Sequence, residues 1–354
     1  MSARNTAGRF LASLASVALL AGCAAGGSPI AAPASSNPDA NPSASVAMPS
    51  PTTAATAVPT PSVLVTSDVA YESSNPTLVP GELDVYAPNK AGPWPVVVML
   101  HGGGNSKGDL SEHARRVADL GFVVFVPTWG AGGVGSSGLP SYEQLLAAQS
   151  QSACAVVFAR AHAAEYGGDP DTLILFGHSA GANMGASVAF AHPEPTGGCL
   201  GGTTLGAIDA LITWEGDWMA LDPRVPWDDA IAADPRLMDG YTSMSHVAKD
   251  KDLKVAMLVS EDPGIERKVA DQATIDAFLA PRDPSGELRR RLEASGAFAD
   301  GIFDVVELQQ LLFSILEAQG NPVSLDVMPD SSHEYIGGGW KVFLAAFPKA
   351  AQRD

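Results

Sequence analysis

The stretch Thr172-Leu173-Ile174-Leu175-Phe176-Gly177-His178-Ser179-Ala180-Gly181 decides the fold of this chain. Its first half is a short apolar run, as expected for a β-strand that is buried on both faces. A helix is predicted directly afterwards, over residues 179–191. A Gly-x-Ser-x-Gly motif between a strand and a helix is typical of a nucleophile elbow, where small residues relieve crowding in a sharp turn. We therefore predict that Ser179 stands exposed at a helix N-terminus, which favours developing negative charge.

A second glycine-rich turn, His101-Gly102-Gly103-Gly104, directly follows the apolar run 96–100. Acyl transfer requires backbone N–H groups that point at an oxyanion, and glycines let the backbone approach closely. A glycine-rich turn without a ligand is the alternative, but the elbow downstream favours the oxyanion interpretation. His101 lies on the strand side of the turn, so we expect it to be structural rather than catalytic.

The chain alternates between strand-like and helical segments from about Val63 onward. Apolar runs predict strands at 81–86, 96–100, 122–126, 172–176, 208–214, 255–259 and 323–327, and periodic patterns predict helices at 110–120, 142–166, 179–191, 304–318 and 340–347. Strands joined by helical crossovers predict an α/β fold with a mostly parallel central sheet and helices on both faces. Residues 264–301 are predicted to be a small helical insertion, either a partial lid or a solvated excursion without a role.

The N-terminus has the layout of an export signal. Residues 1–10 are polar and basic, and residues 11–20 form an apolar run about half as long as the ~20 residues of a membrane span. Leu20-Ala21-Gly22-Cys23 resembles the lipobox of bacterial lipoproteins. The resemblance implies a lipoprotein signal peptide over residues 1–22, a lipid on Cys23, and a protein anchored to the cell membrane on its extracytoplasmic side. An ordinary signal peptide with a chance cysteine is the alternative.

Composition separates a tether from the folded part and limits the partners. Residues 23–62 are rich in Pro, Ala, Ser and Thr and are predicted to be a disordered tether, leaving 63–354 as the catalytic domain. The formal net charge of −18 disfavours nucleic acid and anionic lipid headgroups as partners. No metal site or cofactor is predicted, because the carboxylates beside His333 have no second histidine nearby. Nothing indicates the oligomeric state.

A serine nucleophile needs a base, and the base needs an orienting carboxylate. Of the seven histidines, His333 lies in a loop after the last predicted strand, where the base is expected in the order serine, acid, histidine. Asp262 and Glu261 follow the strand 255–259, and we prefer Asp262 because Asp is shorter and stiffer. Glu215 and Asp217, after the preceding strand, are the alternatives.

From about Leu83 to Gly338 the chain resembles α/β-hydrolase serine esterases of the hormone-sensitive-lipase-like and carboxylesterase-like groups. The residues that carry the resemblance, besides the two glycine motifs, are Leu83-Asp84-Val85-Tyr86-Ala87-Pro88 and Tyr166-Gly167-Gly168-Asp169-Pro170. The resemblance implies a catalytic triad and an oxyanion hole. Their residues would be Ser179, Asp262 and His333, with the amides of Gly103, Gly104 and Ala180.

Two further groups of residues give weaker expectations. Cys154 and Cys199 lie on or beside the helices that flank the elbow strand, and we predict a disulfide between them, with two buried thiols as the alternative. Trp129, Trp214 and Trp218 follow or end predicted strands, so they either line a substrate pocket or pack in the core and its rim.

The predicted activity is hydrolysis of carboxylic esters, with short-to-medium acyl chains, through an acyl-enzyme. The expected partners are a small-molecule or lipid ester and the membrane that holds the anchor. A serine peptidase or a polyester or cutin-type hydrolase on the same machinery is the first alternative. A non-catalytic anchored binding module is the second, and the presence of serine, histidine and acid candidates argues against it.

Overall fold

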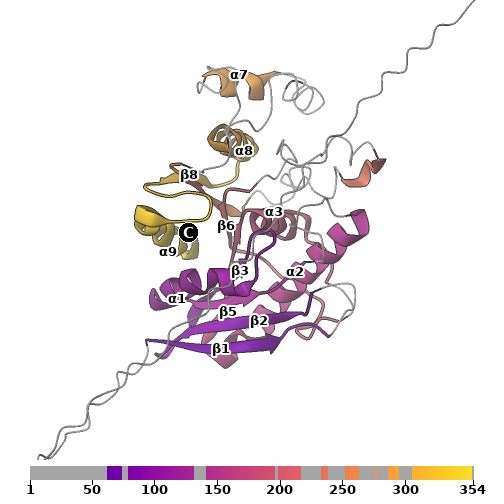
Figure 1. The fold of residues 1–354 in the computed structure, drawn as a ribbon, viewed down its shortest axis with the longest axis vertical. Coiled ribbons are helices and arrows are strands. Elements are labelled where there is room, and N and C mark those ends of the chain that lie inside the picture. Colours follow the sequence, from indigo (N-terminus) through magenta and orange to yellow (C-terminus); the bar gives the residue numbers. More distant parts are fainter. Residues whose placement is uncertain are drawn as a thin grey trace, which may run out of the picture. The chain divides into compact units, whose positions relative to one another are not determined.

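A single eight-stranded sheet organises the computed structural model (Figure 1). The structure describes residues 62–73, 79–130, 141–195, 198–216, 233–237, 252–262, 276, 286–294 and 305–352. The sheet has the strand order β1-β2-β4-β3-β5-β6-β7-β8. Its strands are β1 Val63–Ala70, β2 Glu82–Pro88, β3 Trp94–Leu100, β4 Val123–Pro127, β5 Gly168–His178, β6 Ala210–Trp214, β7 Lys254–Ser260 and β8 Val323–Met328.

Strand direction separates the two halves of the sheet. β1 pairs with β2, and β2 with β4, in antiparallel fashion, whereas every pair from β4 and β3 through to β8 is parallel. The parallel strands are the apolar ones, since β4 and β6 are buried along their whole length. The carboxyl ends of the parallel strands therefore meet at one edge, the edge at which open α/β sheets bind ligands.

Helices cover both faces of the sheet and create two cores. One core packs under α1 (Ser111–Asp119) and α9 (Trp340–Ala351), which lie side by side in Figure 1. The other packs under α2 (Tyr142–His162), α3 (Ala180–Ala186) and α8 (Val305–Gln319). The predicted α/β architecture is thus confirmed, with a mostly parallel sheet between two helical layers.

Two elements differ from the sequence-based expectation. β1 was not predicted, because it is an edge strand whose side chains are mostly exposed and it lacks an apolar run. Its register shifts between Thr66 and Val69, and Asp68 there has a positive φ of 58°. The elbow helix ends early as an α-helix at Ala186 and continues as one π-helical turn, Ser187–Ala191. Within the predicted insertion, α7 spans Glu287–Ala294.

The structure joins Cys154 of α2 to Cys199 in a disulfide with 5.4 Å between the Cα atoms. These are the two cysteines for which the sequence predicts a bond. Cys199 also forms a β-bridge with Glu72. The disulfide closes a loop of 45 residues that contains β5 and α3, so it constrains the layer that carries Ser179.

Several predicted features lie outside the described residues. They are the signal peptide 1–22, Cys23, nearly all of the tether 23–62, Asp217, Trp218 and most of the insertion 264–301. Among the helices that the structure does describe, none has the length and apolar character needed to cross a lipid bilayer.

A half-buried histidine on α1, His113, occupies an aromatic cluster under α9. The His113 ring lies 5.0 Å from the Trp340 ring, 5.5 Å from Phe343 and 5.9 Å from Trp214, measured between centroids. Its Nδ1 atom is buried and has no hydrogen-bond partner among the described residues. Burial lowers the pKa of His113 from 6.5 to about 4.

This pKa shift predicts acid sensitivity with a defined sign. Between pH 6.5 and about 4 the unfolded chain protonates His113 and the folded protein does not, so stability falls as the pH is lowered. The loss is at most roughly 1.4 kcal/mol per pH unit. His113→Phe keeps an aromatic ring and should flatten the pH dependence of the unfolding free energy across this window, measured by urea denaturation. An unchanged slope would contradict the assignment.

Candidate active site

Ser179 occupies a strained turn between β5 and α3. Its φ and ψ are 54° and −120°, a conformation in which residues other than glycine are uncommon. The turn depends on two glycines, because a Cβ atom at Gly177 would collide with the carbonyl oxygen of Gly181, and one at Gly181 with that of Leu100. The helix can therefore start directly behind Ser179, in close contact with the end of β3.

A continuous hydrogen-bonded chain connects Ser179, His333 and Glu215. The Nε2 atom of His333 lies 3.0 Å from Ser179 Oγ, and its Nδ1 atom lies 2.5 Å from Glu215 Oε2. A carboxylate only accepts hydrogen bonds, so Nδ1 carries the proton and Nε2 is left to accept from the serine hydroxyl. The Glu215 side chain is 1% exposed and that of His333 14%, so the chain runs from the interior toward solvent.

Glu215 is fixed by both of its carboxylate oxygens. Oε1 accepts the backbone N–H of Ser260 at 2.6 Å, while Oε2 faces His333. The Glu215 backbone has a positive φ of 53°, and its N–H donates to the carbonyl of Leu258 at 3.2 Å. The next carbonyl, that of Gly216, accepts a hydrogen bond from Nε2 of the fully buried Gln309 on α8 at 2.9 Å. Gln309 could not be identified from the sequence, because its partner is a backbone group.

The structure corrects the predicted acid, since Glu215 and not Asp262 hydrogen-bonds with His333. β6 adjoins β5, and Trp214 pairs in register with His178, so Glu215 emerges beside the nucleophile. Asp262 follows β7, one strand further away, and is exposed, while its backbone N–H donates to the carbonyl of Ser331.

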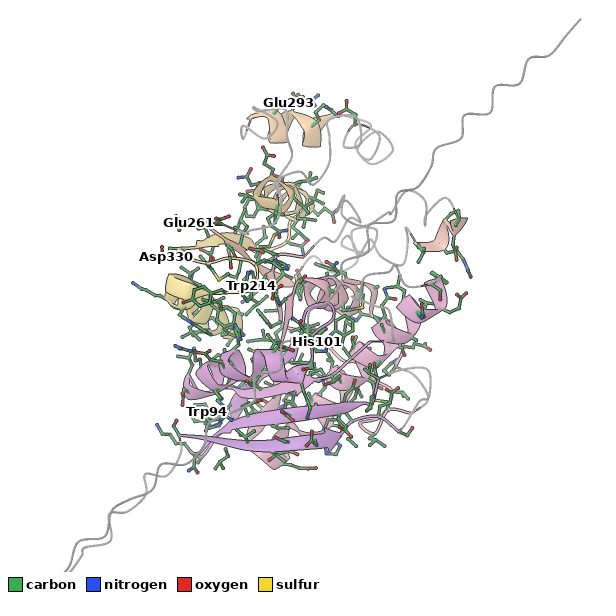
Figure 2. The ribbon with its side chains drawn as sticks, viewed as in Figure 1. Trp94, His101, Trp214, Glu261, Glu293 and Asp330 are labelled. Atoms are coloured by element: carbon green, nitrogen blue, oxygen red, sulfur yellow. A yellow bond between two sulfur atoms is a disulfide. The ribbon has the colours of Figure 1, made fainter. Side chains whose placement is uncertain are left out.

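Glu261, the other acid considered after β7, supports the loop that carries His333. Its Oε2 atom accepts the backbone N–H of Asp330 at 2.9 Å, and Figure 2 shows the two residues next to each other. The Ser331 hydroxyl donates to the carbonyl of Met328 at 2.6 Å and lies 3.3 Å from the Glu261 amide nitrogen, which donates to it. The first residues of the loop that carries His333 are therefore held at the end of β7.

The glycine turn after β3 lies against Ser179, as the sequence predicts. A Cβ atom built on Gly102 would be 3.4 Å from Ser179 Cβ and 3.2 Å from His178 Nδ1. Gly103 and Gly104 continue the turn, and Gly104 has a positive φ of 73°. Ala180 is the first residue of α3, so its N–H has no acceptor within the helix. These three amides belong to the two segments that meet at Ser179, and their role as oxyanion donors stays a prediction.

His101 shapes the glycine turn from the buried side. Its Nδ1–H donates to the carbonyl of Gly102 at 2.8 Å, and the backbone N–H of Trp129 donates to its Nε2 at 3.4 Å. Burial lowers the pKa of His101, which keeps the ring neutral and suited to both contacts. The ring stacks on Trp129 at 5.3 Å between centroids.

A 3₁₀ helix, Lys107–Leu110, follows the glycine turn. An ion pair connects this helix to the antiparallel strands. Lys107 Nζ lies 2.5 Å from Asp84 Oδ1 on β2 and also contacts Asp68 on β1. Ser106 and Asp109 form a capping box at the start of this helix. The glycine turn is thus anchored at both ends.

Two of the three tryptophans proposed for a pocket are buried. Trp129 is 4% exposed and its ring stacks on His101, while Trp214 is 1% exposed and its ring lies tilted against His178. Both therefore pack directly behind the residues that surround Ser179. Figure 2 shows His101 and Trp214 in the interior of the molecule, near β3 and β6.

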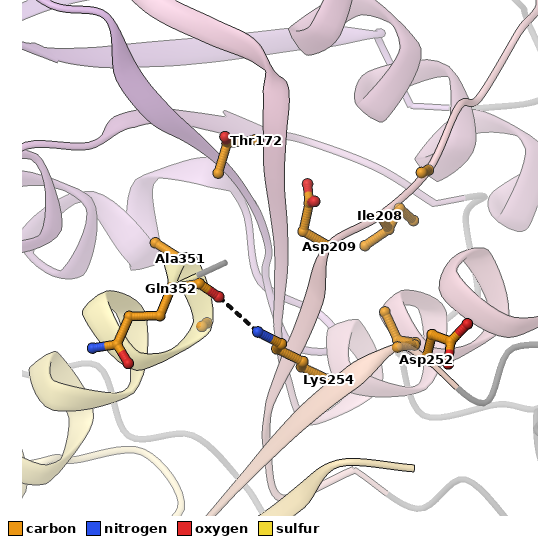
Figure 3. A pocket seen from close by; sticks show the side chains of 10 residues that line it. Thr172, Ile208, Asp209, Asp252, Lys254, Ala351 and Gln352 are labelled. Atoms are coloured by element: carbon orange, nitrogen blue, oxygen red, sulfur yellow. Dashed lines mark hydrogen bonds between the residues drawn. The ribbon is translucent and has the colours of Figure 1, made fainter. Parts of the chain in front are cut away.

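A cavity of about 340 Å³ lies at the opposite edge of the sheet (Figure 3). Its lining includes Thr172, Asp209 and Lys254, at or near the amino ends of β5, β6 and β7. Lys254 Nζ donates to the backbone carbonyl of Gln352 at 2.6 Å across its rim. Because Ser179 lies at the carboxyl ends of the strands, this cavity is separate from the candidate site.

The comparisons with known proteins agree with this architecture. Residues 83–196 match the family model BD-FAE, a stretch that includes both glycine motifs. Over 107 residues the chain is 33% identical to Gut esterase 1 of Caenorhabditis elegans, which amounts to 28% of this chain and 19% of that protein. The chain thus spans about a fifth of the length of this curated relative.

Solved structures resemble the chain over most of its length. A thermophilic esterase from Thermogutta terrifontis is 15% identical with a TM-score of 0.53, over 82% of this chain and 91% of that one. A truncated carbohydrate esterase from gut microbiota is 15% identical with a TM-score of 0.53, over 82% and 97%. Esterase B from Lactobacillus rhamnosis is 13% identical with a TM-score of 0.55, over 82% and 85%. Together with the sheet order and the elbow, these likenesses show that this chain has the α/β-hydrolase fold.

Proposed function

We propose that this protein is a serine hydrolase that cleaves carboxylic esters through an acyl-enzyme on Ser179. The observation that carries the proposal is the hydrogen-bonded chain from Ser179 Oγ through His333 to the buried carboxylate of Glu215. The fold, the match over residues 83–196 and the esterases among the similar proteins support the same reaction class.

The hydrogen bonds assign each proton transfer. Ser179 Oγ attacks the ester carbonyl carbon while its proton passes to His333 Nε2, 3.0 Å away. Glu215 stabilises the imidazolium through Nδ1–H. The tetrahedral intermediate then expels the alcohol, which takes the proton from Nε2, and leaves Ser179 acylated. Water then attacks the acyl carbonyl as the same nitrogen takes its proton, and that proton passes from Nε2 to the departing Ser179 Oγ as the carboxylic acid is released.

Negative charge on the carbonyl oxygen requires donors that are in place before the reaction. The amides of Gly103, Gly104 and Ala180 are the proposed donors, because the glycine turn and the first turn of α3 meet beside Ser179 Oγ. The positive end of the α3 dipole acts in the same direction.

The proposed substrates are esters with short-to-medium acyl chains. A peptidase or a polyester hydrolase would use the same serine, histidine and glutamate, so these activities are outcomes that the substrate test separates. The longest acyl chain that the enzyme hydrolyses efficiently reports the depth of the pocket that binds the acyl group.

We also propose that the protein acts outside the cell, tethered to the membrane by a lipid on Cys23. The proposal rests on the basic and apolar segments that precede Leu20-Ala21-Gly22-Cys23, and on the Pro- and Ala-rich stretch behind them. Such a tether would leave the catalytic domain free to meet its substrate at a distance from the lipid surface.

The first test is a series of p-nitrophenyl esters of increasing acyl length, assayed with the wild type and with Ser179→Ala. The wild type should hydrolyse the shorter members and react covalently with a fluorophosphonate. Ser179→Ala should lose roughly six orders of magnitude in kcat and all labelling. Labelling that persists in Ser179→Ala, or hydrolysis of peptides but not of esters, would refute the proposal.

The second test compares two carboxylates. Glu215→Gln keeps the side-chain length but removes the charge that stabilises the His333 imidazolium, so kcat should fall roughly 10³- to 10⁴-fold. Asp262→Asn is the matched control and should stay within about twofold of the wild type, as for most surface substitutions. The reverse result would restore Asp262 as the acid.

The third test concerns the anchor. In a bacterial host the wild type should partition into the membrane fraction and incorporate radiolabelled palmitate. Cys23→Ser should abolish both without reducing the kcat of the purified protein, because Cys23 lies outside the domain that holds Ser179. Palmitate incorporation into Cys23→Ser would rule out this site of lipidation.

A further inference from the structure

A second histidine beside the nucleophile has no role in the proposed acyl transfer. His178 is the last residue of β5, directly before Ser179, and it is 4% exposed. Its Nε2 atom lies 2.7 Å from the backbone carbonyl oxygen of His333. The end of the nucleophile strand thus contacts His333 twice, once through the Ser179 hydroxyl and once through the His178 ring.

The partner of His178 determines the state of its ring. A carbonyl oxygen only accepts, so Nε2 of His178 must carry a proton. Burial, together with the neighbouring His333, lowers the pKa of His178 from 6.5 to about 3, so the ring is neutral at ordinary pH. The neutral ring therefore donates from Nε2 to the His333 carbonyl at ordinary pH.

The His178 ring also contacts the other parts of the site. Its centroid is 4.2 Å from that of Trp214, the residue before Glu215, and 4.8 Å from that of His333. Its Nδ1 atom faces Gly102, where a Cβ would approach to 3.2 Å. The ring therefore fills the space between the glycine turn, the end of β6 and the His333 ring, and it has little room to move.

The other contacts of the His333 loop lie where the loop begins, at Asp330 and Ser331. Glu261 accepts the N–H of Asp330, and the N–H of Asp262 donates to Ser331, so both fasten the loop to the end of β7. Within the described part of the chain, the bond from His178 is the one recorded contact that holds the His333 backbone to the strand of the nucleophile. A shift of that backbone would carry the His333 ring away from Ser179 Oγ.

We propose that His178 is a positioning residue, which fixes the backbone of His333 so that its Nε2 atom stays within hydrogen-bond reach of Ser179 Oγ. This inference rests on the proposed function. It predicts that the N–H at the Nε2 position matters, and not the imidazole as such. A misplacement of the base by about 1 Å is enough to cost roughly 10²-fold in rate.

Two amide substitutions isolate this N–H. The Nε2 of a glutamine can occupy the place of the imidazole Nε2, so His178→Gln should keep the bond to His333 and remain within about fivefold of the wild-type kcat. Asparagine has the same chemistry but is too short to reach the carbonyl. His178→Asn should lose about 10²-fold in kcat, with KM changed less than about threefold, because binding of the ester does not need the base.

His113→Asn is the matched control, because His113 is also a neutral histidine packed against Trp214, is half-buried, and has no hydrogen bond or ring contact with His333 among the described residues. It should lose thermal stability while its kcat stays within about twofold, when each variant is assayed well below its melting temperature. The fluorophosphonate labelling rate should follow the same ranking, with the wild type and His178→Gln fast and His178→Asn slow.

The outcomes distinguish this inference from the proposed function. An inactive and unlabelled wild type would overturn both. If the wild type is active, three results would overturn the role of His178 alone. They are an unchanged kcat in His178→Asn, a kcat in His178→Gln as low as that of His178→Asn, and an equal loss of kcat in His113→Asn. Should His178→Asn fail to fold, His178→Met serves instead, because its side chain has about the length of glutamine but no donor. Full activity of that variant would also overturn the role of His178, and a loss of about 10²-fold would support it.

Discussion

The close approach of α3 to the end of β3 is the constraint on which the rest of the site depends. Any side chain at Gly181 would collide with the carbonyls of Leu100 and His101, and any at Gly177 would collide with Gly181 itself. Only with both glycines can the helix begin immediately after Ser179. The same contact brings the Gly102 turn to the nucleophile, so one steric condition places the hydroxyl, the helix N-terminus and the turn together.

This arrangement holds the Ser179 backbone in a strained conformation, at φ 54° and ψ −120°, and contacts with neighbouring residues stabilise it. Its N–H donates to the carbonyl of Trp214 at 2.8 Å, which ties the strained residue to the neighbouring strand β6. Glu215, the next residue, is also held at positive φ. Two residues in unusual conformations thus directly follow the adjacent strands β5 and β6, which pair in the buried parallel part of the sheet.

Much of this arrangement follows from sequence by simple rules. Apolar runs such as 96–100 and 172–176 have one stable environment, the middle of a parallel sheet, so fold class and the ends of those strands were predictable. Ser179 and His333 follow from their places after such strands. β1 was missed because an exposed edge strand is specified by its partner β2 rather than by its own pattern.

The acid was harder to predict because two neighbouring strands each end in carboxylates. Nothing local distinguishes Glu215 from Asp262, since both follow an apolar strand of the same sheet. The choice depends on which way the His333 ring turns, and that is set by contacts between residues more than 100 positions apart. Gln309 is hidden for the same reason, because a glutamine whose partner is a distant backbone carbonyl leaves no pattern in the sequence.

Glu215 directly follows β6, and this position affects how the sequence of such a protein can diverge. The chain between β7 and α8, which holds the insertion and α7, contributes none of the three residues of the hydrogen-bonded chain. Drift, lengthening or replacement of this segment beyond Asp262 leaves Ser179, His333 and Glu215 untouched, provided that α8 keeps its contact with Gly216. Glu261 and Asp262, at the start of the segment, must keep their contacts with the His333 loop. Changes can therefore accumulate in one contiguous stretch of the gene while Ser179, Glu215 and His333 are inherited unchanged from the parts of the chain that precede and follow it.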